Sequence, residues 1–252
     1  INYEYNYTRD ITMYWFQSVY VCKEHRKNGL FRKMYQAMYS KAKAENIHSL
    51  KLYVEEENES AQKAYVKLGM ANTKEEMLEI DFALSPAREL HFEKVCAGIP
   101  NISEYSFRQL RKEDLVDLNL DDFISILDET RDKSKMQEGL KKCAEDINMA
   151  EISVLTHNEK VIGILSAFYE YHDWINSIIY WANDLRIKSK SQKEQKELTA
   201  LIFKFYTEKI SQKGPLALRI PTGKCQDWLK ELLLECGAIV SCYLIYEQII
   251  DQ

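Results

Sequence analysis

The amino-acid sequence predicts a mixed α/β fold built from two copies of one pattern. Three observations predict it: a strand, glycine turn and helix at residues 14–42, a second strand and helix at residues 52–69, and an internal repeat at a constant offset further along the chain. At 252 residues the chain can form one large hydrophobic core or two ordinary ones. Two related domains in tandem account for all three observations.

The first block carries the strongest local signal. Residues 14–21 are rich in aromatic and β-branched side chains, which predicts a strand. An apolar stripe with helical spacing follows at Leu30, Met34 and Met38, and it is widened by Phe31, Tyr35 and Ala42. Between them, Gly29 lets the backbone approach a ligand, and the free amides at the start of the helix favour an anion. The basic residues at this place are Lys23, Arg26, Lys27, Arg32 and Lys33. The block predicts a phosphate-binding loop, and a simple turn is the alternative.

The second block has the form strand, turn and short helix. Residues 52–55 predict the strand, Asn58 precedes the helix, and Gly69 ends it. One side of this helix carries Ala61, Ala64, Tyr65 and Leu68.

Together the two blocks resemble the GNAT superfamily of N-acetyltransferases. Its pyrophosphate loop has the form Arg/Gln-x-x-Gly-x-Gly/Ala, which Arg26 and Gly29 match and from which Phe31 departs at the final small position. Its later Asn-x-x-Ala-x-x-x-Tyr pattern is met in full by residues 58–65. The resemblance implies a mostly antiparallel central sheet, splayed near its centre and flanked by helices.

The resemblance also implies an activity, the transfer of an acetyl group from acetyl-CoA to a primary amine by direct attack in a ternary complex. Tyr65 is then the expected general acid, and side-chain packing is its structural alternative. Glu4 is a weaker candidate for a base or amine-binding group, and a solvent-facing strand carboxylate is the alternative. The expected cofactor contacts are Val19, Tyr20, Val21, Arg26, Lys27, Asn28, Gly29, Leu30, Phe31, Arg32 and Asn58.

The repeat places a second copy after the first. Tyr3-Glu4-Tyr5 recurs at residues 169–171 and Tyr14-Trp15 at residues 180–181, both offset by 166 (169 − 3 and 180 − 14). The predicted division is a first domain at 1–82 that lacks its front half, a linker at 83–102 and a second domain at 103–252. The front half of the second copy predicts strands at 105–110, 151–156 and 161–169 and helices at 122–129 and 135–146.

The second copy has lost the phosphate-binding residues. Gln192 and Gln195 stand where the first copy has Arg26 and Gly29, and Glu194 and Glu197 would repel a phosphate. We therefore expect a degenerate domain with a structural or substrate-shaping role. This leaves three interpretations of the whole chain: an active acetyltransferase, a coenzyme-A-binding pseudoenzyme or sensor, and a structural fusion without turnover.

Composition restricts the partners. A net charge of −5 argues against nucleic-acid binding by the whole surface, and no apolar run approaches the roughly 20 residues that a membrane span needs. The six cysteines and five histidines are scattered without metal-ligand spacing, so we expect reduced thiols, no metal and a cytoplasmic protein. The expected partner is a small-molecule or peptide amine, and a homodimer is left open.

Overall fold

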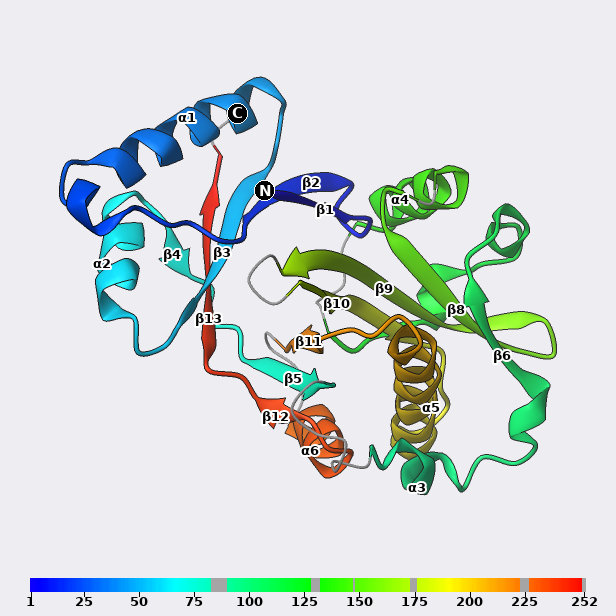
Figure 1. Cartoon of the computed structure of the whole chain (residues 1–252). Coiled ribbons are helices and arrows are strands. Elements are labelled where there is room, and N and C mark those ends of the chain that lie inside the picture. The colour runs from blue at the N-terminus through cyan, green and yellow to red at the C-terminus, as the bar shows by residue number, and fades with distance from the viewer. Residues whose placement is uncertain (83–89, 128–131, 147, 173–175, 223–226, 251–252) are drawn as a thin grey trace. The chain divides into compact units, whose positions relative to one another are not determined.

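Two β-sheets with attached helices form from the predicted blocks (Figure 1). The structure is a computed structural model that describes residues 1–82, 90–127, 132–146, 148–172, 176–222 and 227–250. It divides into two compact units. Unit 1 consists of Ile1–Asn6, Ile11–Glu75 and Cys242–Gln252, and unit 2 of Tyr7–Asp10 and Glu76–Ser241.

Unit 1 is built on a five-stranded sheet of order β1-β2-β3-β13-β4. The pairing of β2 with β3 is parallel and every other pairing of this sheet is antiparallel. The strands are β1 (Asn2–Asn6), β2 (Ile11–Phe16), β3 (Ser49–Glu55), β4 (Ala71–Asn72) and β13 (Tyr243–Ile249), and the helices are the 3₁₀-helix η1 (Lys23–His25), α1 (Leu30–Ala44) and α2 (Glu59–Lys67).

The sheet of unit 1 splays between β2 and β3. Their parallel pairing ends at Phe16 opposite Leu52, while β3 continues to Glu55 in contact with β13. The strand predicted at 14–21 therefore stops at Phe16, and that part of the prediction is wrong. Residues 17–21 leave the β ladder while β3 continues, which opens the sheet at its centre.

Helix α1 begins at Leu30, as the sequence predicts, and packs most of the predicted stripe of side chains against the core. Leu30 is 38% exposed and Met34 50% exposed, whereas Tyr35 and Ala42 are buried. The face that packs on the core of unit 1 consists of Phe31, Tyr35, Met38, Tyr39 and Ala42. Of the predicted stripe, Phe31, Tyr35, Met38 and Ala42 therefore face the core, while Leu30 and Met34 do not, since only one face of the helix can contact the sheet.

Unit 2 contains a sheet of order β12-β5-β11-β10-β9-β8-β6, with β7 paired to β10. Only β10 and β11 pair in parallel among these described strands. The strands are β5 (Met77–Asp81), β6 (Tyr105–Gln109), β7 (Ile124–Ser125), β8 (Glu151–His157), β9 (Lys160–His172), β10 (Ser177–Ile187), β11 (Ala217–Pro221) and β12 (Ile239–Val240).

The core of unit 2 is dominated by its longest helix. Ten residues of α5 (Gln192–Ser211) are buried, and they pack with α6 (Asp227–Glu235) and α3 (Phe92–Cys96). Phe92 and Cys96 lie in this core, so residues 90–102 of the predicted linker are integrated into unit 2; residues 83–89 lie outside the described part. The remaining helical elements are η2 (Ile102–Glu104), η3 (Lys112–Leu115), η4 (Leu120–Asp122) and α4 (Lys133–Glu145).

The front half of the second copy follows the prediction with one exception. The strands predicted at 105–110, 151–156 and 161–169 are β6, β8 and β9, and the later helix is α4. The helix predicted at 122–129 is wrong over its described part, because Ile124 and Ser125 form β7 and pair with Ile187 and Arg186. Its last residues, 128–129, lie outside the described residues.

The two sequence repeats exchange equivalent strands. Strands β5 and β13 begin at residues 77 and 243, which are 166 apart, the same offset that relates β2 (residue 11) to β10 (residue 177). Yet β5 pairs with β11 and β12 in unit 2, and β13 pairs with β3 and β4 in unit 1. The compact units therefore do not coincide with the predicted ranges 1–82 and 103–252.

Candidate functional site

The glycine loop leaves the start of α1 free to bind an anion. Gly29 is the residue before the helix and has a φ of 71°, in the left-handed region that favours glycine, and Lys27 has a φ of 64°. No side chain caps the first amides of α1, and no acidic residue lies in its first turn. Uncapped amides at a helix start, within a basic segment, are a site for phosphate.

Arg26 contacts the segment that precedes the loop. Its Nε donates a hydrogen bond to the carbonyl oxygen of Val21 at 2.8 Å, and its guanidinium lies 5.4 Å from the ring centroid of Tyr20. These contacts join the start of the loop to the segment that leaves the sheet. The geometry therefore gives Arg26 a positioning role in addition to its predicted place among the cofactor contacts.

The segment that leaves the sheet faces the site through its backbone. Val19 packs its side chain against the core of unit 1, while Tyr20 is exposed. Since β2 ends at Phe16, the amides of Val19 and Val21 are not used in the β2–β3 ladder. Backbone amides of this kind can contact an extended ligand that enters the splay.

The two sequence motifs meet through aromatic rings. Phe31 in the first turn of α1 packs edge-on against Tyr65 of α2, with ring centroids 5.7 Å apart. Tyr246 of β13 also packs on Tyr65, with the two ring centroids 5.9 Å apart. The departure from the family pattern at Phe31 thus places an aromatic wall beside the predicted general acid. Sequence reasoning missed Tyr246.

Burial controls the protonation of Tyr65. Desolvation raises the pKa of its phenol above the ordinary value of 10. The hydroxyl therefore keeps its proton at neutral pH. Because an ordinary thiol has a pKa near 8.5, proton transfer from Tyr65 to a thiolate is uphill, and the hydroxyl acts best as a donor that gives its proton late.

Asn58 and Glu4 both have structural partners. The side chain of Asn58 caps α2 by accepting a hydrogen bond from the amide of Ala61 at 3.2 Å. Its contact with the cofactor stays a prediction. Glu4 on β1 is fully buried, so the solvent-facing alternative is wrong. It accepts a hydrogen bond from Trp15 Nε1 and lies 3.6 Å from Lys51 Nζ. A role of Glu4 as base stays a prediction.

The other predicted contacts share one continuous stretch of chain. Lys27, Asn28, Leu30 and Arg32 lie within the loop and the first turn of α1, next to Gly29 and Phe31. The structure thus brings residues 26–32 and Tyr65 together through the ring contact, while Glu4 belongs to a separate buried cluster on β1 and β2.

The equivalent place in unit 2 is occupied by helix. Residues 192–197, which replace the glycine loop, form the first turns of α5. Ser191 caps that helix by accepting from the amide of Glu194 at 3.2 Å, and the Glu194 carboxylate accepts from the amide of Lys190 at 2.6 Å. A side-chain cap and a carboxylate thus occupy the start of this helix, where the first copy has an uncapped, basic loop, which supports a degenerate second copy.

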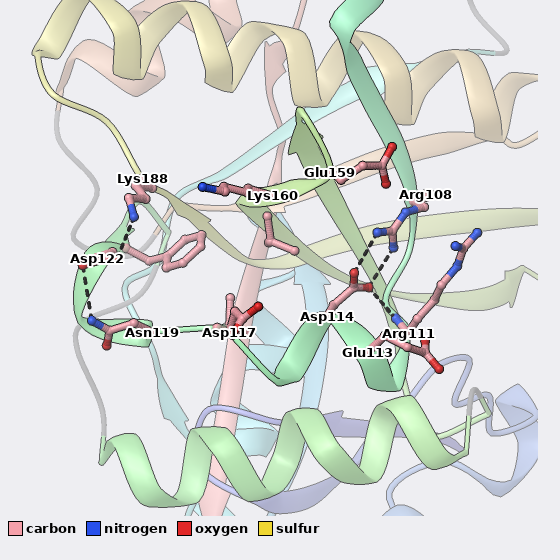
Figure 2. Close-up of a pocket in the computed structure, with 13 residues that line it drawn as sticks. Arg108, Arg111, Glu113, Asp114, Asp117, Asn119, Asp122, Glu159, Lys160 and Lys188 are labelled. Carbon is pink, nitrogen blue, oxygen red and sulfur yellow. Dashed lines mark hydrogen bonds and ion pairs between the residues drawn. The ribbon is translucent and has the colours of Figure 1, made fainter.

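A cavity of about 670 Å³ lies in unit 2, at the β8–β9 turn and the helices η3 and η4 (Figure 2). Asp114 accepts two hydrogen bonds from Arg108, both at 2.7 Å, and Lys188 lies 2.6 Å from Asp122. These pairs neutralise much of the charge that lines the cavity, so its walls are stabilised by internal ion pairs. Sequence reasoning did not predict this cavity.

The described residues contain neither a cluster of metal-ligand side chains nor a helix suited to cross a membrane. No group of three or more His, Cys, Asp or Glu side chains there is arranged to hold a metal ion. Within those same ranges, no helix combines the length and the apolar character needed to cross a bilayer. The described cysteines, Cys22, Cys96, Cys143, Cys236 and Cys242, are free thiols, and Cys225 lies outside the described part.

Solved structures share the architecture of the whole chain. A tandem GNAT protein from the clavulanic acid biosynthesis pathway is 9% identical, with a TM-score of 0.54 over 94% of this chain and 76% of that one. A conserved protein of unknown function from Bacteroides thetaiotaomicron is 9% identical, with a TM-score of 0.52 over 87% of this chain and 75% of that one. The chain therefore has a tandem GNAT fold, and the predicted mixed α/β class is confirmed.

Sequence comparison identifies the first block. Residues 3–70 match the Acetyltransferase (GNAT) family, and no curated protein matches the chain. A third solved structure is the GCN5-related glucosamine N-acetyltransferase region of a fungal multi-domain β-N-acetylglucosaminidase, 10% identical, with a TM-score of 0.55 over 95% of this chain and 30% of that one. The predicted resemblance to the GNAT superfamily is thus supported over residues 3–70, which lie in unit 1 except for Tyr7–Asp10.

Proposed function

We propose that unit 1 is an acetyl-CoA-dependent N-acetyltransferase that acts on a primary amine of a small molecule or peptide. The observation that carries the proposal is the uncapped start of α1, which lies in a basic loop and is joined by ring contact to Tyr65. The family match over residues 3–70 supports acyl transfer from an acyl-CoA in general. The acetyl group and the amine are the specific part of the proposal.

In the proposed reaction, the first amides of α1 and the loop cations bind the pyrophosphate. The amides of Val19 and Val21 donate hydrogen bonds to the pantetheine arm and to the thioester oxygen, whose negative charge grows as the amine attacks. A C–N bond forms, the C–S bond breaks, and the sulfur takes a proton from the Tyr65 hydroxyl. The proton lost by the attacking nitrogen passes to solvent or to a base, and the Tyr65 phenolate regains a proton from solvent.

The proposal describes the amine acceptor only by its positive charge. Glu55, Glu56 and Glu57 are exposed at the turn between β3 and α2, the turn that precedes the helix of Tyr65. A carboxylate run raises the local concentration of a cationic amine. A solvated turn is the alternative role of these side chains.

Binding and turnover are tested separately. Calorimetry measures acetyl-CoA affinity, and release of free thiol is followed with a panel of primary amines. We expect Tyr65→Phe to lower kcat and kcat/KM by the same factor while acetyl-CoA affinity stays within about twofold, because only the hydroxyl is removed. Binding without turnover by any amine would replace the enzyme by a coenzyme-A-binding module, and absence of binding would leave a structural fusion.

A further inference from the structure

The strand that completes the sheet of unit 1 comes from the end of the second repeat. Residues 243–249 form a ladder of seven antiparallel pairs with β3, from Tyr243 opposite Glu55 to Ile249 opposite Ser49. In Figure 1 this strand, β13, is red and runs beside the blue β3. The unit with the phosphate loop therefore depends on a segment that follows the degenerate copy in sequence.

This strand contacts both helices that carry the site motifs. Tyr246 packs on Tyr65 and donates a hydrogen bond from its hydroxyl to Gln62 Oε1 of α2 at 3.3 Å. Two residues on, Gln248 accepts a hydrogen bond from the hydroxyl of Tyr35 on α1. Since alternate residues of a strand point to the same face, Tyr246 and Gln248 form one contact surface towards α1 and α2.

The contact with Tyr246 has a direct effect on the proposed proton donor. Tyr246 is 4% exposed and belongs to the buried core of unit 1, against which the half-buried Tyr65 packs. The Tyr65 ring therefore contacts the rings of both Phe31 and Tyr246, each within 6 Å by ring centroid. Removing the Tyr246 ring would take away one wall, let the Tyr65 ring move and admit water to it.

We propose that Tyr246 is a positioning residue for the acetyl transfer, supplied to the active unit by the second repeat. The proposal rests on the proposed function of unit 1. It makes the two repeats one functional entity, in which the copy without a phosphate loop holds the general acid of the other copy in place. Tyr246 acts through Tyr65 and does not itself contact the reacting atoms.

The test compares four variants of the full chain. Tyr246→Ala removes the ring, Tyr246→Leu keeps apolar volume without the flat ring, and Tyr246→Phe keeps the ring and removes the hydroxyl. Ile249→Ala is the matched control, because Ile249 lies on the same strand but is 51% exposed. Circular dichroism shows which variants are folded, and Tyr246→Leu decides the question where Tyr246→Ala is unfolded.

We expect Tyr246→Ala and Tyr246→Leu to lower kcat about ten- to a hundredfold, since small misplacement of a catalytic group has effects of this size. Acetyl-CoA affinity should change by no more than about twofold, because the loop amides are unaltered. Tyr246→Phe should restore wild-type kcat to within about threefold, and Ile249→Ala should retain it. Equal kcat in Tyr246→Leu and the control would overturn the proposal, as would a loss in Tyr246→Phe as large as in Tyr246→Leu.

A second readout does not require activity. The Tyr65 phenol is titrated by nuclear magnetic resonance in protein with labelled tyrosine, with Tyr65→Phe identifying its signal. Loss of the Tyr246 ring should lower the Tyr65 pKa towards the ordinary value of 10, since water reaches the phenol. An unchanged Tyr65 pKa in Tyr246→Leu would overturn the proposal. Failure of the wild-type chain to bind acetyl-CoA would refute the function of unit 1 instead, and the titration keeps the two failures distinct.

Discussion

Replacing Gly29 by alanine separates backbone strain from ligand binding. Gly29 has a φ of 71°, and a Cβ added there would meet no other atom within 4 Å. The cost to stability is therefore conformational, roughly 1–2 kcal/mol for an L-residue held in the left-handed region. For a chain of this size each kcal/mol lowers Tm by about 2–4 °C. The open space beside Gly29 is the space that a phosphate bound to the α1 amides would need.

The matched control is Gly214, whose φ is 62° and whose added Cβ would also meet nothing within 4 Å. Gly29→Ala and Gly214→Ala should lower Tm by similar amounts. Only Gly29→Ala should weaken acetyl-CoA binding, by about ten- to a hundredfold, the value of one lost charge-assisted hydrogen bond of about 1.5–3 kcal/mol. Calorimetry gives the affinities. Equal affinity in both variants would refute the assignment of this loop as the phosphate site.

Two further predictions concern unit 2. Burial raises the pKa of Asp114, but hydrogen bonds from Arg108 and the Arg111 amide outweigh it and leave that pKa below 3.8. The contribution of Asp114 to stability is therefore present above about pH 4 and is lost as the pH falls through the lowered pKa. Urea unfolding should show that Asp114→Asn is less stable than wild type at pH 7 and loses less stability than wild type on acidification. The fragment 103–252 lacks β5 and α3 and should unfold at lower urea than the fragment 76–241, which retains both; equal midpoints would show that neither is needed.

Local signals explain which parts of the site could be predicted. Gly29 with its positive φ, the start of α1 at Leu30 and the cap at Asn58 all depend on residues within a few positions of each other. Such features are encoded in short stretches of sequence, since they depend on backbone preference and nearby hydrogen bonds. The contact between Phe31 and Tyr65 needed only that both motifs pack on one sheet.

Non-local pairing explains what could not be predicted. β5 and β13 occupy equivalent places in the two repeats, so either strand could fill the gap in either sheet. Nothing in an alternating apolar pattern specifies which partner strand is used. The same limit applies to residues 124–125, whose strand conformation depends on pairing with β10, more than 60 residues away.

The strand exchange gives the second repeat a physical role that survives the loss of its own phosphate site. Its helix α5 starts where the loop should be, with Ser191 as a cap and Glu194 in the first turn, so we expect phosphate binding to be lost while the buried face of the helix is kept. Its last strand meanwhile supplies Tyr246 to the unit that keeps the loop. Each sheet contains a strand from the other repeat: β5 in the sheet of unit 2 and β13 in the sheet of unit 1. Unfolding of either sheet therefore breaks strand pairs of both repeats. We therefore expect the second repeat to be required for the proposed acetyl transfer even without a phosphate site of its own.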